Sequence, residues 1–361
     1  MKFNRQMFLD ILAMHQGNID RKAINPIFSY VKLHFDGKFL KITSTDGQRF
    51  LEHSISNDSA ECQILINGVV FYELLKKSKS KFFEIKEVYD SYKILIDDAD
   101  FSFVKKTDDI FPSWIGEYEY NFSINAKILS EALKTVKWAM SIEDSRPYLN
   151  GVCLKFKEDV IDVCATDGLR IALEKIFKKT DLAGSWIISR KSVLELIKLL
   201  DEHSDNDIQL FLGKNIKVIL KNEFAEIIWQ SLLVAGEFPN YERVIPTSFL
   251  SSLMVNSKEL LDIIERIMIM ANQAQKIITL HLCNKSKVSS DNVLSSGEDY
   301  LPGVYNGEEM KILLNGRFLC EMLSNLNSDV VFEINGPHSP LAIKKLENNG
   351  SVFILAPIKQ N

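Results

Sequence analysis

The sequence is poor in the features that mark membrane, secreted and metal-binding proteins. None of its apolar runs approaches the ~20 residues that a membrane-spanning helix needs. The N-terminal segment is charged and amphipathic, without the apolar core or cleavage site of a signal peptide, so we expect a cytoplasmic protein. The cysteines are odd in number and form no C-x-x-C pair, which predicts reduced core thiols: Cys62, Cys153, Cys164, Cys283 and Cys320.

Catalytic motifs are equally scarce. The six histidines are isolated, with no H-x-x-x-H or H-E-x-x-H pattern. No Walker phosphate-binding loop occurs, and no G-x-G-x-x-G motif follows a predicted strand. The Asp167-Gly168 pair offers one carboxylate, whereas a metal loop needs several oxygen ligands at close spacing. We therefore predict a structural turn at this pair, and we expect neither a metal nor another cofactor.

The chain also lacks the excess of positive charge that is typical of proteins gripping nucleic acid over their whole surface. Its 43 basic and 48 acidic residues give a formal net charge of −5. A hydrophobic share of 46% and a charged share of 25% match ordinary globular chains. Any contact with DNA must therefore be local or loose.

What the sequence does contain is a repeated unit. The motif Thr45-Asp46-Gly47-Gln48-Arg49 returns 121 residues later as Thr166-Asp167-Gly168-Leu169-Arg170. Each copy follows an alternating apolar stretch, which predicts a strand that runs into an Asp-Gly turn. A second match aligns Glu73, Glu195 and Glu321, each in an amphipathic helix that begins after an Asn or Ser cap.

A third match starts each copy, because a short apolar strand ends in an asparagine that precedes a helix. These helices are expected near residues 5–15, 126–140 and 257–271. The order strand, helix, alternating strands, helix and strands predicts an α+β fold in which helices cover one face of an antiparallel sheet. The predicted domains are residues 1–120, 121–248 and 249–361. The Ser-rich segment 284–306 is expected to be a solvated loop.

Four segments carry a resemblance to a known family. RPYLNGV (146–152), ATDGLRIA (165–172), GEFPNYERVIP (236–246) and the terminal ILAPIK resemble the signature segments of the bacterial DNA polymerase sliding clamp, the β subunit of the replicative polymerase. The resemblance runs the whole length of the chain. It implies three similar domains per chain, a head-to-tail homodimer that forms a ring around duplex DNA, helices lining the hole, sheets outside and no catalytic activity.

The resemblance also implies where the partners bind. The replicative polymerase, the clamp loader, other DNA polymerases and repair proteins would share a pocket for short peptides with apolar anchors. Carried over by motif, its candidates are Arg146, Tyr148, Leu149, Thr166, Gly168, Leu169, Arg170, Ile171, Pro239, Arg243, Val244, Asn315, Phe318, Ile354, Ala356, Pro357 and Ile358. Family members often have His at position 169 and Met at 356 and 358, so the pocket wall is expected to be shallower here.

The ring implies two further groups of residues. The basic residues expected to face DNA are Arg5, Lys22, Lys76, Lys77, Lys127, Lys134, Arg190, Lys191 and Lys198. The dimer contact is expected to join Phe101 and Phe103 of the first domain to Ile269 and Met270 of the third. Such a ring needs only weak, sequence-independent attraction to phosphates, which suits an acidic chain.

Two other hypotheses remain open at this point. One is an enzyme that uses Asp167, Arg146 and Arg170 on a phosphorylated substrate, although no catalytic constellation accompanies them. The other is a repeated-domain adaptor that binds peptides without encircling DNA. Of these hypotheses, only the sliding clamp requires a ring dimer of about twice the chain mass of 41.2 kDa.

Overall fold

The structure is a computed structural model that describes the chain apart from residues 23, 107–110, 222–224, 273, 348–349 and 360–361. Its contacts divide the chain into two compact units. Unit 1 comprises residues 1–130 and 194–233, and unit 2 comprises residues 131–193 and 234–361. This division falls inside the predicted central domain, so the domain boundaries near 120 and 248 stay a prediction.

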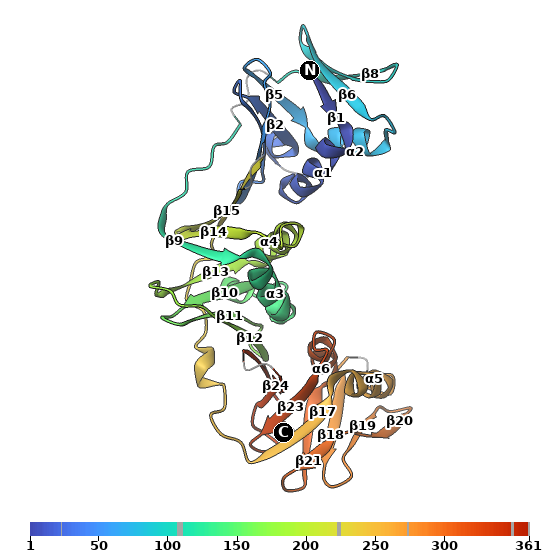
Figure 1. Ribbon diagram of the computed structural model, residues 1–361. Helices are drawn as coiled ribbons and strands as arrows, with labels where there is room; N and C mark the ends of the chain where they lie inside the picture. Colours follow the sequence, from blue (N-terminus) through green and yellow to red (C-terminus); the bar gives the residue numbers. More distant parts are fainter. Residues whose placement is uncertain (23, 107–110, 222–224, 273, 348–349, 360–361) are drawn as a thin grey trace. The chain divides into compact units, whose positions relative to one another are not determined.

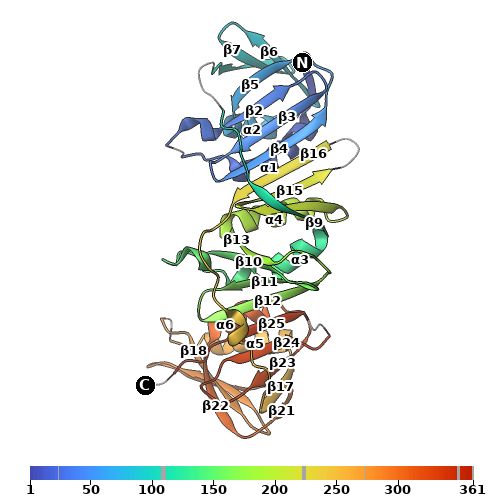
Figure 2. The same cartoon turned by 90° about the vertical axis from the view of Figure 1, so that its left-hand side faces the viewer.

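Unit 1 contains two antiparallel sheets, whose strands are blue to teal (residues 1–130) and yellow-green to yellow (residues 194–233) in Figures 1 and 2. Its elements are β1 (Lys2–Asn4), α1 (Arg5–His15), β2 (Tyr30–Phe35), β3 (Phe39–Thr45), β4 (Arg49–Ser56), β5 (Cys62–Asn67), α2 (Gly68–Lys77), β6 (Phe82–Val88), β7 (Ser91–Ile96), β8 (Ala99–Val104), β9 (Tyr118–Asn125), β14 (Asp207–Gly213), β15 (Asn215–Lys221) and β16 (Ala225–Leu232). The smaller sheet has the order β1-β6-β7-β8, and the larger has the order β5-β2-β3-β4-β16-β15-β14-β9.

Unit 2 has the same kind of architecture. Its elements are β10 (Gly151–Phe156), β11 (Val160–Thr166), β12 (Arg170–Phe177), β13 (Gly184–Ser189), β17 (Ser251–Asn256), α5 (Ser257–Met268), β18 (Ile277–Leu282), β19 (Lys287–Asp291), β20 (Ser296–Tyr300), β21 (Val304–Asn306), β22 (Met310–Asn315), α6 (Gly316–Leu323), β23 (Asp329–Ile334), β24 (Leu341–Lys345) and β25 (Ser351–Leu355). The sheets have the orders β20-β19-β18-β22 and β13-β10-β11-β12-β25-β24-β23-β17-β21. The division between the units runs through α3 (Ala126–Val136) and α4 (Arg190–Glu202).

Each larger sheet joins strands from two successive repeats. In unit 1, β4 pairs with β16, so that Leu51 lies opposite Trp229. In unit 2, β12 pairs with β25, so that Ala172 lies opposite Phe353. We call these strand pairs the first joint and the second joint. Trp229 and Phe353 are at most 1% exposed, so each joint is packed on a buried aromatic side chain.

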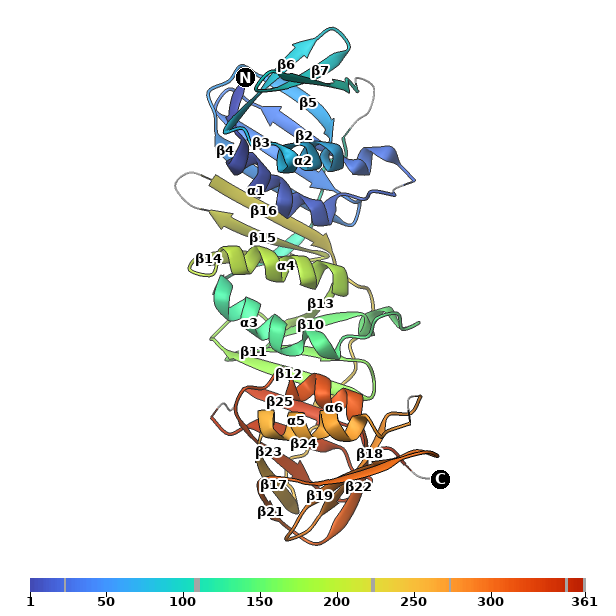
Figure 3. The same cartoon turned by 90° about the vertical axis from the view of Figure 1, so that its right-hand side faces the viewer.

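The helices begin where the sequence predicts, because asparagine side chains cap them. Asn4 Oδ1 accepts a hydrogen bond from the Met7 amide at 3.0 Å, and Asn67 Oδ1 accepts one from the Val70 amide at 3.0 Å. Asn256 and Asn315 cap α5 and α6 in the same way. Within unit 1, α1 and α2 cover one face of the sheet, as Figure 3 shows.

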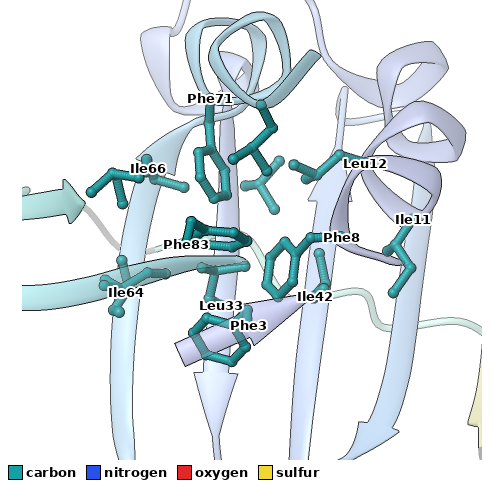
Figure 4. Close-up of a cluster of buried hydrophobic side chains, with 14 of the residues drawn as sticks. Phe3, Phe8, Ile11, Leu12, Leu33, Ile42, Ile64, Ile66, Phe71 and Phe83 are labelled. Carbon is teal, nitrogen blue, oxygen red and sulfur yellow. The ribbon is translucent and has the colours of Figure 1, made fainter. Parts of the chain in front are cut away.

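The core of unit 1 is built around packed aromatic rings, shown in Figure 4. Phe8 contacts Phe83 edge-on at 5.1 Å between ring centroids, and Phe3 lies 5.5 Å from Phe83. Phe71 of α2 approaches the same ring at 5.7 Å, so both helices and the sheet meet in one cluster. This burial follows the alternating and helical apolar patterns of the sequence.

The expectation of a solvated loop over residues 284–306 is wrong. Most of this segment forms β19, β20 and β21, and β19 pairs with β20 in antiparallel register from Lys287 opposite Tyr300 to Asp291 opposite Ser296. Val288 is fully buried, whereas most of its neighbours are polar and half-exposed. A strand with one polar face at the edge of a sheet therefore has the composition of a loop.

Two buried histidines face each other in unit 1. His15 Nε2 lies 3.1 Å from His53 Nδ1, and His15 Nδ1 lies 2.6 Å from the hydroxyl of Ser44. Burial holds the pKa of His15 well below its usual value, and the neighbouring His53 lowers it further. Burial, with a contribution from His203, lowers the pKa of His53 to about 3. Both imidazoles are therefore neutral in the folded protein where they would be protonated in the unfolded chain.

We predict that this pair makes the stability of unit 1 fall as the pH drops below 6.5. The unfolded chain binds protons on both histidines in that range while the folded unit does not, so each costs up to about 1.4 kcal/mol per pH unit. In urea unfolding between pH 7 and pH 4, His53→Gln should make this pH dependence shallower by roughly that amount. The exposed His338→Gln is the matched control, and parallel curves for wild type and His53→Gln would contradict the prediction.

Candidate functional site

The candidate site is a pocket of about 220 Å³ in unit 2, beside the second joint. It is lined by Arg146, Leu149, Thr166, Gly168, Leu169, Arg170, Ile171, Pro239, Asn240, Tyr241, Val244, Pro340, Ile354 and Ala356. These residues come from segments that lie far apart in the sequence. The turn between β11 and β12 and the chain leaving β25 meet there with two short 3-10 helices, Pro147–Leu149 and Tyr241–Arg243.

Most of the residues expected from the sequence line this pocket, and some do not. Those outside its lining are Tyr148, Arg243, Asn315, Phe318, Pro357 and Ile358. Asn315 caps α6, and the amide of Ile358 donates to the carbonyl of Leu313 at 2.8 Å. Tyr148 lies against the backbone of Gly236. These three residues therefore serve contacts outside the pocket lining.

The pocket floor is formed by the paired strands of the second joint. Ile171 lies opposite Ile354, and both are buried. The amide of Ala356 donates to the carbonyl of Leu169 at 3.0 Å, which holds the chain after β25 against the β11–β12 turn. Leu169 is 57% exposed and Val244 is 41% exposed, so apolar surface remains accessible above a buried floor. Such a floor with an open rim can receive an apolar side chain.

Sequence reasoning missed Asn240, Tyr241 and Pro340. The hydroxyl of Tyr241 donates to Asp162 Oδ2 at 2.7 Å, and burial together with this carboxylate raises the pKa of Tyr241. Tyr241 stands in the same FPNYERV segment as Pro239 and Val244, so the motif could have suggested it. Pro340 precedes β24 in a segment that matches no repeat, and nothing in the sequence pointed to it.

One edge of the pocket is formed by Arg146. Its guanidinium donates two hydrogen bonds of 2.9 Å to the carboxylate of Asp144, and these bonds lower the pKa of Asp144 to about 2. A Cβ atom at Gly168 would lie 3.6 Å from Arg146 Nη2. Gly168 has a φ of +92°, which an L-residue rarely adopts, so the Asp-Gly turn needs this glycine.

Behind the pocket, Arg170 separates it from a second hollow of about 550 Å³. Its guanidinium lies 2.5 Å from Glu321 of α6 and stacks at 4.3 Å over the ring of Phe318. Phe318 thus lies on the far side of Arg170, in the second hollow. Phe318, which was expected in the peptide pocket, therefore lines the second hollow instead.

The residues expected to face DNA lie on helices, except Lys22, which follows α1. The side chains of Lys76, Lys77, Lys127, Lys191 and Lys198 are exposed. Arg5 differs, because its guanidinium donates to the carbonyls of Ser80 and Leu75 and so closes the C-terminal end of α2. Arg190 donates to the carbonyl of Met140 at 3.2 Å.

Of the four residues expected at the dimer contact, Phe101 and Phe103 lie on the edge strand β8, whereas Ile269 and Met270 follow helix α5. Phe101 is 38% exposed on the edge strand β8, while Phe103 packs 6.3 Å from Phe71 of its own core. Ile269 is 70% exposed at the end of α5. Met270 lies beside Gly297 of the edge strand β20.

Two other kinds of site have no counterpart in the described part of the chain. Over the described ranges, no group of three or more His, Cys, Asp or Glu side chains is placed to hold a metal ion. Across the same residues, no helix is long and apolar enough to cross a membrane. All five cysteines are free thiols.

Three family models match the chain in succession. They describe the N-terminal, central and C-terminal domains of the DNA polymerase III β subunit and match residues 1–113, 123–240 and 242–359. The chain belongs to the DNA polymerase III β subunit family. The predicted fold of three similar α+β domains is thereby confirmed.

Individual members of the family are distant in sequence and close in structure. A β sliding clamp of Pseudomonas aeruginosa is 26% identical over 365 residues, which cover 98% of each chain. One of Buchnera aphidicola is 30% identical over 237 residues, or 64% of this chain and 63% of the relative. The crystal structure of the P. aeruginosa β subunit matches with a TM-score of 0.93 at 24% identity, covering 100% of both chains.

Membership in the DNA polymerase III β subunit family makes the chain a non-catalytic processivity factor of DNA replication. The hypothesis of an enzyme acting through Asp167, Arg146 and Arg170 is therefore wrong. In the structure, each of these groups is engaged in an internal ion pair. Asp167 binds Arg170 at 2.9 Å, and Arg146 binds Asp144.

Proposed function

We propose that two copies of this chain join head to tail in a ring that encircles duplex DNA and holds polymerases through the pocket in unit 2. The observation that carries the ring is the pattern of sheet edges. Each joint pairs the fourth strand of one repeat with the last strand of the next, β4 with β16 and β12 with β25. The strands that correspond to these in the remaining positions are β20 and β8, and both are edge strands.

The side chains at the edges support the same pairing. Phe101 lies opposite Ile94 on its hairpin, as Trp229 lies opposite Val218. Phe101 is therefore the counterpart of Trp229, the aromatic residue buried in the first joint, yet it is 38% exposed. Pairing of β20 with β8 of another copy would cover it. A head-to-tail contact of this kind, repeated twice by symmetry, closes a ring.

We predict that an acidic side chain at either edge separates the copies without unfolding them. Phe101→Asp and Ile269→Asp each place a charge where apolar surface would be covered, so sedimentation should show particles near the chain mass of 41.2 kDa in place of dimers. Leu250 is 82% exposed and lies on neither edge strand, so the control variant Leu250→Asp should remain dimeric. Dimers of both edge variants at the wild-type dissociation constant would place the contact elsewhere.

The helices supply a weak and sequence-independent attraction to DNA under this proposal. Their exposed lysines are spread over α2, α3 and α4, while the chain as a whole carries a net charge of −5. A ring retains DNA by topology, so a few phosphate contacts are sufficient and strong binding would oppose sliding.

We predict that neutralising two helix lysines weakens loading on closed circular DNA in a salt-dependent manner. For Lys127→Gln with Lys198→Gln, the negative slope of log K against log salt should become shallower by about 0.9 for each phosphate that is no longer neutralised. Lys38→Gln with Lys179→Gln removes the same charge from exposed loop positions and should leave the slope unchanged. Equal retention on linear and circular duplexes would contradict the topological mechanism.

The pocket in unit 2 is proposed to bind the short apolar motifs of the replicative polymerase, other polymerases, repair proteins and the clamp loader in competition. Its buried floor at Ile171 and Ile354 and its accessible rim at Leu169 and Val244 support this role. Apolar anchors in such pockets carry a large share of peptide affinity. The small Ala356 leaves one wall low.

We predict opposite effects for two substitutions on a synthetic peptide that carries a Leu-Phe pair. Leu169→Asp should weaken binding at least tenfold in calorimetry, because a charge replaces exposed apolar rim. Ala356→Met should tighten binding by about fivefold, since it adds contact area worth about 1 kcal/mol. Phe177→Asp, at a 69% exposed residue at the far end of β12, is the control for Leu169→Asp. Wild-type affinity in Leu169→Asp would place the peptide site elsewhere.

A further inference from the structure

The first joint holds a buried ion-pair cluster centred on Arg49. This side chain is 1% exposed, and its Nη1 lies 2.6 Å from a carboxylate oxygen of Glu195 on α4. Its Nη2 donates to Asp46 at 2.5 Å and to the carbonyl of Gly17, just after α1, at 3.0 Å. The arginine thus ties the turn of one repeat to its own first helix and to the second helix of the next repeat.

The second joint repeats this cluster group by group. Arg170 is 7% exposed, and its Nη1 donates to Glu321 on α6 at 2.5 Å. Its Nε donates to Asp167 at 2.9 Å, and its Nη2 donates to the carbonyl of Trp138 at 3.2 Å. The aspartate, the arginine and the carbonyl are each displaced by the 121 positions that relate the two T-D-G motifs.

The third repeat keeps the turn and has no arginine in it. The turn between β19 and β20 begins at Asn292, whose Oδ1 accepts from the amides of Leu294 at 2.8 Å and Ser295 at 2.9 Å. Asp46 Oδ1 accepts in the same pattern from the amides two and three residues later, and the second of these belongs to Arg49. Asn292 therefore corresponds to the aspartate, and Ser295 corresponds to the arginine.

The amide of Asn292 also takes over one bond of the missing guanidinium. Its Nδ2 donates at 2.7 Å to the carbonyl of Met270, just after α5, as arginine Nη2 does to Gly17 and to Trp138 in the joints. The helix end is thus satisfied inside the repeat. No cation is left at position 295 to reach a carboxylate on a neighbouring repeat.

The carboxylate that such a cation would meet is present. Glu73 lies half-buried on α2, at the position that aligns with Glu195 and Glu321 in the repeated helix. A buried arginine–glutamate pair slows separation, because its short, charge-assisted hydrogen bonds must break before water can solvate the two groups. A joint without the arginine lacks this resistance.

We propose that Ser295 and Asn292 set the strength of the joint between copies. They replace the arginine–aspartate pair that ties the two repeats together in both joints within the chain. This inference rests on the proposed head-to-tail ring, in which β20 of one copy meets β8 of the other. The two joints within each chain then contain the buried arginine cluster, and the joint at each contact between chains does not. The difference lies in two side chains of a turn in which the first residue, aspartate or asparagine, accepts the same pair of backbone amides in all three repeats.

The test introduces the aspartate and the arginine of the joints into the third repeat. In the variant Asn292→Asp with Ser295→Arg, subunit exchange between dimers carrying donor and acceptor dyes should slow at least tenfold relative to wild type. Adding Glu73→Gln removes the acceptor carboxylate and should restore wild-type exchange. The inference would be overturned if the variant Asn292→Asp with Ser295→Arg is folded and dimeric and exchanges subunits at the wild-type rate. Absence of wild-type dimers would instead refute the ring itself.

A reciprocal experiment covers the case in which the rebuilt turn does not fold. Asp46→Asn with Arg49→Ser gives the first joint the residues of the third repeat. Hydrogen exchange of the β4 and β16 amides in the full chain should then become at least tenfold faster, while amides of the second joint keep their protection. Unchanged protection of the first joint in this variant would also overturn the inference.

Discussion

Antiparallel pairing across the repeat boundary is the constraint on which the rest of the structure depends. Because β4 pairs with β16 and β12 with β25, each larger sheet is shared by two repeats. The buried rings of Trp229 and Phe353 lie on these pairs. The contacts therefore group half of the central repeat with each neighbour. A row of such repeats leaves one strand at each end that is an edge of its sheet, here β8 and β20.

The turn before each joint strand performs several tasks with few residues. In the second joint, Arg170 binds Glu321 across the repeat boundary and also forms a wall of the pocket. The backbone of the same turn accepts from Ala356, and the equivalent turn of the first joint accepts from Leu232 at 2.9 Å. Joint and pocket therefore share their framework, and a change in the turn affects both.

The two joints differ in the side chains around this common framework. In the first joint, the ring of Phe28 lies against Gly47, where an added Cβ would be 3.1 Å from it, and Trp114 lies 6.4 Å from Phe50. In the second joint, the place that corresponds to Phe28 by the 121-residue offset belongs to Leu149, which lines the pocket. Aromatic bulk in one joint and a smaller side chain in the other support the proposal of a single peptide site per chain.

The sequence by itself determined the local structure and the repetition. Asparagine caps, Asp-Gly turns and apolar periodicity act over a few residues, so they predicted the helix starts and the turn at Gly168. The motif segments also led to most of the pocket residues. The sequence did not distinguish the polar hairpin over 284–306 from a loop, because an edge strand with one wet face has the same composition.

Only the tertiary structure decided which side chains face the pocket. Phe318 proved to lie behind Arg170, Tyr241 proved to be anchored on Asp162, and Pro340 joined the lining from an unmarked loop. It also decided that Arg49 and Arg170 meet carboxylates that are distant in the chain, on Glu195 and Glu321. These contacts arise from strand pairing between distant segments, and no local pattern of residues encodes where such segments meet.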